Sequence, residues 1–165
     1  YPSSGAKVGD IVLAQAEIAG DEGVLTHDGF KDMEYIGIPL LKTATSVIFT
    51  TYSASESLLK QALHRLSVSS GPRRTGVHCG PFVTLSTCTG TTVRARELEE
   101  RYHGLCENME GAAAAQVAEL HAIPWLEVRG ISNIVEDRDV QKWDIPKAAN
   151  ASQQALMQIL EGWKE

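Results

Sequence analysis

Residues 105–133, LCENMEGAAAAQVAELHAIPWLEVRGISN, carry the patterns of a strand, a helix and a second strand in immediate succession. We expect strands over 105–108 and 124–132, and a helix over 109–122 whose four consecutive alanines allow close packing against a sheet. Because a helix that connects two strands usually makes them parallel neighbours, this stretch predicts an α/β layered fold.

The flanking sequence continues the alternation of strands and helices. VGDIVLA (8–14) is typical of a strand, and GVHCGPFVTLSTC (76–88) predicts a strand with a bulge or bend at Gly80-Pro81. Gly-rich residues 20–37 predict a long loop. We therefore expect one domain over residues 1–165, with a mixed, largely parallel core sheet between helices.

Three helices are predicted outside the central stretch. One follows a capping box at 53–56, one is capped by Thr92 and ends near His103, and one begins at Asp144. The buried stripe of the last helix is expected to contain the following residues: Ala149, Leu156, Ile159, Leu160 and Trp163.

Charge and composition exclude several classes of function. The 165 residues carry 15 Lys and Arg against 21 Asp and Glu, and the one basic pair is Arg73-Arg74, so we expect no nucleic-acid partner and no anionic membrane surface. Three cysteines without a CxxC pair favour a reduced, cytoplasmic protein. No His or Cys spacing is typical of a metal site, and no GxGxxG or GxxxxGK fingerprint occurs, so no metal or cofactor is expected.

Polar residues follow two of the predicted strands. Glu107, Asn108 and Glu110 lie at the end of the first strand, where the helix begins, and Ser132-Asn133 lie at the end of the second. Because open α/β folds bind ligands at the carboxyl ends of their strands, the two groups could hold one small molecule. Alternatively, the glutamates complement the helix dipole and Asn133 turns the chain.

Two further features have similar double interpretations. Gly90, in STCTGT (86–91), would let the backbone approach a ligand, or it belongs to a plain strand-to-helix turn. Trp143 could cover a flat ligand, or it could fasten the last helix to the core.

Taken together, four strings resemble the nucleoside phosphorylase and nucleosidase superfamily, and within it the futalosine hydrolases. The strings are KVGDIV (7–12), NMEGAAAAQV (108–117), RGISN (129–133) and WDI (143–145), in that order over nearly the whole chain. The resemblance implies the three-layer αβα fold of that superfamily. It also implies that the first strands of the family sheet, and the carboxylate that handles the attacking water, would precede residue 1.

The resemblance assigns roles to particular residues. Glu110 would accept hydrogen bonds from the ribose 2′- and 3′-hydroxyls, and Met109 would pack beneath the sugar. Asn133 would hold the N7 and O6 edge of the purine as the catalytic amide, supported by Ser132, and Trp143 would cover the base.

Three further positions also match binding positions of the family. Gly90 and Thr91 would line the base pocket, and Asn108 stands where the adenine-specific nucleosidases have Glu. Asn133 itself replaces an Asp of those relatives. Because an amide can donate to a C6 oxygen while it accepts from a protonated N7, the replacement favours a hypoxanthine-type base.

The implied activity is hydrolysis of futalosine to hypoxanthine and dehypoxanthine futalosine, a step of menaquinone biosynthesis. Alternatives are another purine nucleosidase or phosphorylase of the methylthioadenosine/adenosylhomocysteine type, and a non-catalytic nucleoside-binding domain. The expected partners are a small-molecule nucleoside and further copies of the chain, because family members commonly dimerise through the segment that matches residues 20–37.

Overall fold

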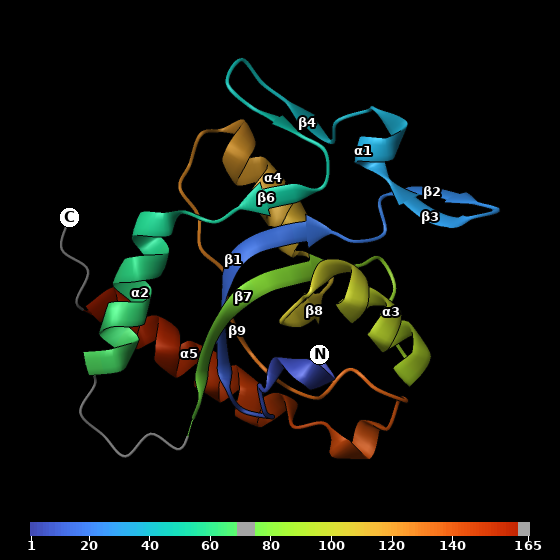
Figure 1. Cartoon of the computed structure of the whole chain (residues 1–165). Helices are drawn as coiled ribbons and strands as arrows, with labels where there is room; N and C mark the ends of the chain where they lie inside the picture. The colour runs from blue at the N-terminus through green and yellow to red at the C-terminus, as the bar shows by residue number, and fades with distance from the viewer. Residues whose placement is uncertain (69–74, 162–165) are drawn as a thin grey trace.

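The computed structural model describes residues 1–68 and 75–161, which form a five-stranded sheet with helices on both faces (Figure 1). The strands lie in the order β6 (Thr51–Ser53), β1 (Ile11–Ala19), β7 (Val77–Thr84) and β8 (Cys106–Asn108), and β9 (Val128–Gly130) also pairs with β1. The β1–β7 and β7–β8 ladders are parallel, whereas β6 and β9 run antiparallel to β1. This confirms an α/β fold with a mixed, largely parallel sheet.

Two helices cover one face of the sheet and a third covers the other. Residues of α2 (Glu56–Val68) and α5 (Ile145–Glu161) pack on Ile11 and Leu13 of β1. On the opposite face, α4 (Gly111–Leu120) packs its alanines near Ala19 and Tyr52. Helix α3 (Thr92–Tyr102) adds Leu98 to a further cluster beyond the end of β7.

Strand β1 contains one extra residue, Gln15, opposite the Gly80–Pro81 peptide of β7. The register pairs Ala14 with Gly80 and Ala16 with Pro81, so Gln15 has no partner in β7. The predicted irregularity at Gly80-Pro81 is confirmed, but the additional residue lies in β1. Since proline has no N–H to give to a ladder, a bulge opposite it is the place where a central strand tolerates it.

The bulge exchanges the two faces of β1. Before it, Ile11 and Leu13 face α2 and α5. After it, Glu17 pairs with Phe82, whose side chain belongs to the cluster on the opposite face. Side chains of a strand alternate with a period of two, and the bulge takes Gln15 out of this alternation, so Glu17 faces α4; if Gln15 were regularly paired, Glu17 would face α2 and α5.

Residues 20–37 are not the predicted loop. They contain a hairpin of β2 (Gly23–Thr26) and β3 (Gly29–Asp32), followed by the short helix α1 (Met33–Ile36). Asp32 caps α1, because its side chain accepts from the amide of Tyr35. Most residues of both strands are exposed or half-buried, so they lack the hydrophobic alternation that predicts strands. A second small hairpin follows, with β4 (Leu41–Lys42) and β5 (Val47–Ile48).

Several predicted boundaries are also corrected. Ser53 is the last residue of β6 and pairs with Ala16, so the capping box predicted at 53–56 is wrong. Helix α2 starts after Ser55 instead, whose carbonyl accepts a hydrogen bond from the Leu59 amide. Helix α3 is capped by Thr91 rather than Thr92. Within 124–132 only Val128–Gly130 form a strand. The segment before it makes isolated hydrogen bonds, including one from the Ala14 amide to the Glu127 carbonyl.

The buried stripe of α5 agrees with the prediction only at Ile159, which is buried. Ala149 is exposed, and Leu156 and Leu160 are about half-exposed, whereas Ala148 and Ala155 are buried in their place. Trp163, the last predicted member, lies outside the described residues, as does the Arg73-Arg74 pair. Within the described ranges, no helix is long and apolar enough to cross a membrane.

Candidate functional site

The ends of the sheet strands surround a cavity of about 240 Å³. It is lined by the turn after β8, by the segment that follows β9, and by the chain leading to α5. Five of the predicted site residues lie around it: Asn108, Met109, Ser132, Asn133 and Trp143. Residues about 35 positions apart in the sequence therefore meet around one cavity. The predicted shared carboxyl edge is wrong, because β9 is antiparallel to β1 and its carboxyl end lies beside the start of β1.

Three predicted residues do not line this cavity. Gly90 and Thr91 lie beyond it, where the Gly90 carbonyl accepts from the Arg138 amide and Thr91 caps α3 by accepting from the amide of Arg94. Glu110 lines an adjoining open groove of about 450 Å³. Arg129 lines both spaces, so Glu110 stands next to the cavity rather than in it.

Thr89 takes the place in the cavity wall that was predicted for Gly90 and Thr91. Its hydroxyl oxygen is buried and has no hydrogen-bond partner among the described residues. Its amide donates to Glu107 Oε1 at 2.8 Å, and the Tyr1 hydroxyl lies 3.5 Å from Glu107 Oε2. Glu107 therefore fastens the loop after β7 to β8, and the Thr89 hydroxyl is left to face a ligand.

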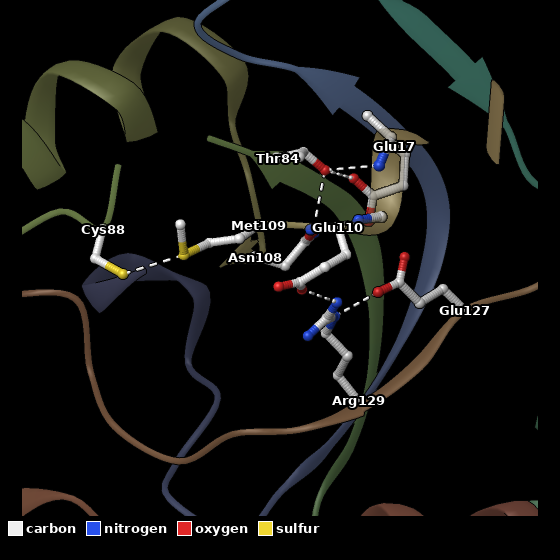
Figure 2. Close-up of polar contacts among 10 residues, drawn as sticks. Glu17, Thr84, Cys88, Asn108, Met109, Glu110, Glu127 and Arg129 are labelled. Atoms are coloured by element: carbon white, nitrogen blue, oxygen red, sulfur yellow. Dashed lines mark hydrogen bonds and ion pairs between the residues drawn. The ribbon is translucent and has the colours of Figure 1, made fainter. Parts of the chain in front are cut away.

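Asn108 organises the start of α4 (Figure 2). Its side chain is 5% exposed, and its Oδ1 accepts from the amides of Gly111 at 2.7 Å and Glu110 at 3.1 Å. Its Nδ2 donates to Glu17 Oε1 at 2.8 Å. Both polar atoms of Asn108 thus bind protein groups, and they hold the peptide that carries Met109 and Glu110.

Glu17 is the buried carboxyl group that the sequence interpretation missed. It is 0% exposed on β1, and Thr84 of β7 donates its hydroxyl to Glu17 Oε2 at 2.7 Å (Figure 2). Burial and the neighbouring carboxyl group of Glu127 raise the pKa of Glu17 from its ordinary value of 4.5 to about 8. The signal was a single carboxylate in the apolar strand IVLAQAEIA.

Glu110 is held from the side by Arg129. The Glu110 side chain is 76% exposed, and its Oε2 lies 3.4 Å from Arg129 Nη2. The same guanidinium donates from Nε to Glu127 Oε1 (Figure 2). Sequence analysis gave no role to Arg129 or Glu127, because the contact between Arg129 and Glu110 depends on how β9 and α4 pack.

Asn133 keeps part of its hydrogen-bonding capacity. Its Oδ1 accepts from the Ser132 hydroxyl at 2.7 Å, and its Nδ2 donates to the Ile134 carbonyl at 3.2 Å. A primary amide has two N–H groups and two acceptor lone pairs, so one of each remains for a ligand. Trp143 lies across the same cavity with the Arg138 guanidinium 4.6 Å from its ring centre, in cation–π range.

Met109 forms part of the cavity floor. It is 45% exposed, and its sulfur lies 3.4 Å from the thiol of Cys88 (Figure 2). A soft thioether at this place can pack against a sugar ring or an aliphatic group. Among the described residues, no group of three or more His, Cys, Asp or Glu side chains could hold a metal ion.

A family model described as "Phosphorylase superfamily" matches residues 2–161. The futalosine hydrolase of Streptomyces coelicolor is 36% identical over 163 residues, which cover 96% of this chain and 62% of that protein. The futalosine hydrolase of Acidothermus cellulolyticus is 33% identical, with 96% and 60% covered. The chain thus spans about three fifths of the length of these curated relatives.

Solved structures with the same fold include nucleosidases with bound ligands. An S-adenosylhomocysteine nucleosidase from Streptococcus pyogenes aligns with a TM-score of 0.76 at 21% identity, over 98% of this chain and 64% of that one. The 5′-methylthioadenosine/S-adenosylhomocysteine nucleosidase from Neisseria meningitidis gives the same TM-score at 18% identity, over 96% and 64%. At these identities, the likeness shows the shared fold.

Asn108→Ala should lower the free energy of unfolding by about 2–4 kcal/mol, because it removes the acceptor for two amides at the start of α4 and one of the two donors to the buried Glu17. Urea denaturation would measure the loss. The matched control is Thr91→Ala, which removes the exposed cap of α3 and should cost about 1 kcal/mol. Equal losses in the two variants would contradict the role given to Asn108.

The stability of the protein should depend on pH through Glu17. The folded protein keeps a proton on Glu17 up to about pH 8, whereas the unfolded chain releases it near 4.5, so the free energy of unfolding falls as pH rises between these values. The slope is at most about 1.4 kcal/mol per pH unit. Urea titrations at several pH values should show this slope in the wild type and not in Glu17→Gln. If the free energy of unfolding depended on pH equally in both proteins, Glu17 would not be the group responsible.

Proposed function

Because the chain belongs to the phosphorylase superfamily, we propose that it binds the sugar and the base in a nucleosidase that hydrolyses futalosine. The observation that carries the proposal is one cavity that joins Met109, Asn133 and Trp143, beside the carboxylate of Glu110. The two futalosine hydrolases that are 36% and 33% identical over 96% of the chain support this substrate. The products would be hypoxanthine and dehypoxanthine futalosine, which places the reaction in menaquinone biosynthesis.

The sugar would bind at the start of α4. The Glu110 carboxylate is exposed and oriented by Arg129, so it is free to accept hydrogen bonds from the 2′- and 3′-hydroxyls of ribose. Met109 would contact the apolar underside of the ring. Asn108 holds the backbone of both residues and contributes to sugar binding through their position.

The base would lie between Asn133 and Trp143. The free N–H of Asn133 matches a carbonyl oxygen at C6, and its free lone pair matches a protonated N7. Ser132 fixes the amide by donating to Oδ1. The unpartnered Thr89 hydroxyl can serve the same ligand.

Hydrolysis breaks the bond between C1′ and N9, and the electron pair goes to the purine. The oxygen of water adds to C1′, one proton of that water remains on the new hydroxyl, and the purine gains the other proton. The sugar is oxocarbenium-like in the transition state, so groups that stabilise charge on the leaving purine accelerate the reaction. Asn133, which would touch N7 and O6, is the catalytic residue that this chain contributes.

The protein would form an oligomer with at least one further copy of the chain. The β2–β3 hairpin and the residues after it expose large apolar side chains, including Leu25, Tyr35 and Ile38. Exposed apolar side chains gathered on one projecting segment favour a protein interface. This is the segment for which sequence analysis predicts a contact between subunits.

The activity is tested by incubating the complete nucleosidase that contains this chain with futalosine, with and without phosphate, and measuring the released base by chromatography. We expect hypoxanthine at a rate that does not depend on phosphate. Release only with phosphate would indicate a phosphorylase, and release of adenine from methylthioadenosine alone would indicate an adenine-specific nucleosidase. Binding without release would indicate a nucleoside-binding domain.

Glu110→Ala should weaken nucleoside binding at least about a hundredfold. Two hydrogen bonds from hydroxyls to a carboxylate are lost, each worth about 1.5–3 kcal/mol. Calorimetry measures the dissociation constant. The control is Glu97→Ala, which removes a glutamate paired with an arginine on α3 and should leave affinity unaltered. If Glu110→Ala bound the nucleoside as tightly as the wild type, Glu110 would not bind the sugar and would only complement the dipole of α4.

Asn133→Asp should change base selectivity. The variant loses the donor to the C6 oxygen, which costs about 2–4 kcal/mol for a hypoxanthine nucleoside, or roughly a thirty- to thousandfold loss in kcat/KM. Aminofutalosine, with an amino group at C6, should lose much less. The measurement compares kcat/KM for both substrates, with Asn150→Asp as the control. A selectivity ratio that changes by less than about threefold would contradict base recognition by Asn133.

A further inference from the structure

Glu17 and Glu127 meet in the space that a side chain of residue 111 would fill. A Cβ placed on Gly111 would overlap Glu17 Oε1 and would lie 2.6 Å from Glu127 Oε2. One oxygen from each carboxyl group therefore lies within 2.6 Å of a single point. Gly111 lies inside a helix and has no positive φ, so the space, and not backbone freedom, requires a glycine there.

Two carboxyl groups this close cannot both be ionised without strong repulsion, and one proton between them relieves it. The contacts show which group keeps its charge. Glu127 Oε1 accepts from the Arg129 guanidinium, so its negative charge has a cationic partner. Glu17 accepts only from the neutral side chains of Asn108 and Thr84 among the described residues.

We propose that Glu17 and Glu127 share one proton and act as a dyad that positions Arg129, and through Arg129 the sugar-binding carboxylate of Glu110. Glu17 holds the proton and donates it to Glu127 Oε2. Glu127 Oε1 is then fixed toward Arg129 Nε, and Arg129 Nη2 is directed at Glu110. The assignment of the sugar to Glu110 rests on the proposed function, whereas the dyad and its contact with Arg129 do not.

The other groups around the dyad leave its charge balance intact. From β8, the thiol of Cys106 faces Glu17, and burial raises the pKa of that thiol far above its usual range, so it stays neutral. Thr84, which contacts Glu17 from β7, has a neutral side chain. From the start of α4, Glu110 faces Arg129. Arg129 pairs with the carboxylates of both Glu127 and Glu110, so loss of the shared proton would place a third negative charge around one guanidinium.

This arrangement makes the position of Arg129 depend on pH. When the shared proton is lost, a second negative charge beside Glu127 competes with Glu110 for the guanidinium. The pKa of Glu17, raised to about 8, places this change between pH 7 and 9. Nucleoside affinity is then expected to fall over the same interval.

The test compares the wild type with Glu17→Gln, whose amide donates to Glu127 but does not titrate. Two readouts need no nucleoside. The infrared C=O band of a protonated carboxyl group should be present at pH 7, decline toward pH 9, and be missing in Glu17→Gln. The NMR signal of the Arg129 Nε–H should move over the same interval only in the wild type. Glu56→Gln, an exposed glutamate on α2, serves as the control and should behave as the wild type.

The third readout is the dissociation constant of aminofutalosine, whose base does not titrate between pH 7 and 9. It should rise about tenfold over this interval in the wild type and less than twofold in Glu17→Gln. Glu127→Gln and Gly111→Ala should weaken binding at pH 7 about tenfold, the first by removing the anionic partner of Arg129 and the second by filling the space of the dyad.

The outcomes separate the dyad from the proposed function. A missing infrared band, or an Arg129 signal that moves equally in wild type and Glu17→Gln, overturns the dyad. The expected spectra together with equal pH profiles of binding overturn its positioning role. The expected spectra without any nucleoside binding support the dyad and its hold on Arg129 while they overturn the proposed function.

Discussion

A carboxyl group without access to water must keep hydrogen-bond partners, and in this protein that constraint falls on Glu17. Its partners come from the ends of two neighbouring strands, Thr84 on β7 and Asn108 on β8. The Thr84 hydroxyl also accepts from the Ala112 amide, and Asn108 accepts from the Gly111 amide, so the same side chains satisfy the free N–H groups of α4. One buried carboxyl group therefore fixes the strand ends and the helix that form the site.

The fold could be predicted because its larger elements repeat simple patterns. Helices α2 and α5 have long amphipathic sequences, and the strand–helix–strand unit from β8 to β9 is continuous in the chain. The bulge at Gln15 could not be placed, because a single extra residue leaves an apolar strand equally apolar. The hairpin of β2 and β3 was missed because its exposed strands have no buried face to produce an alternating pattern.

The residues of the candidate site could also be predicted only in part. Met109, Ser132, Asn133 and Trp143 were found from local strings, and the cavity brings them together. Thr89 was missed by one or two positions, because the string fixes a loop but not which of its residues turns inward. Arg129 and Glu127 carry no local signal. The antiparallel pairing of β9 with β1 brings them to the start of α4. The sequence of β9 alone, or of α4 alone, does not predict that packing.

The bulge in β1 and the glycine at position 111 together accommodate the carboxyl group of Glu17. Without the bulge, if Gln15 took part in the regular alternation of β1, Glu17 would turn to the face covered by α2 and α5, where the neighbouring side chains are apolar. With it, Glu17 faces the start of α4, where any side chain larger than that of glycine would occupy the space of its carboxyl group. An exposed carboxylate that is proposed to bind a sugar needs a rigid support, because ordering a mobile side chain on binding costs entropy and lowers the affinity. The line from Glu17 through Glu127 and Arg129 gives Glu110 such a support from the centre of the sheet.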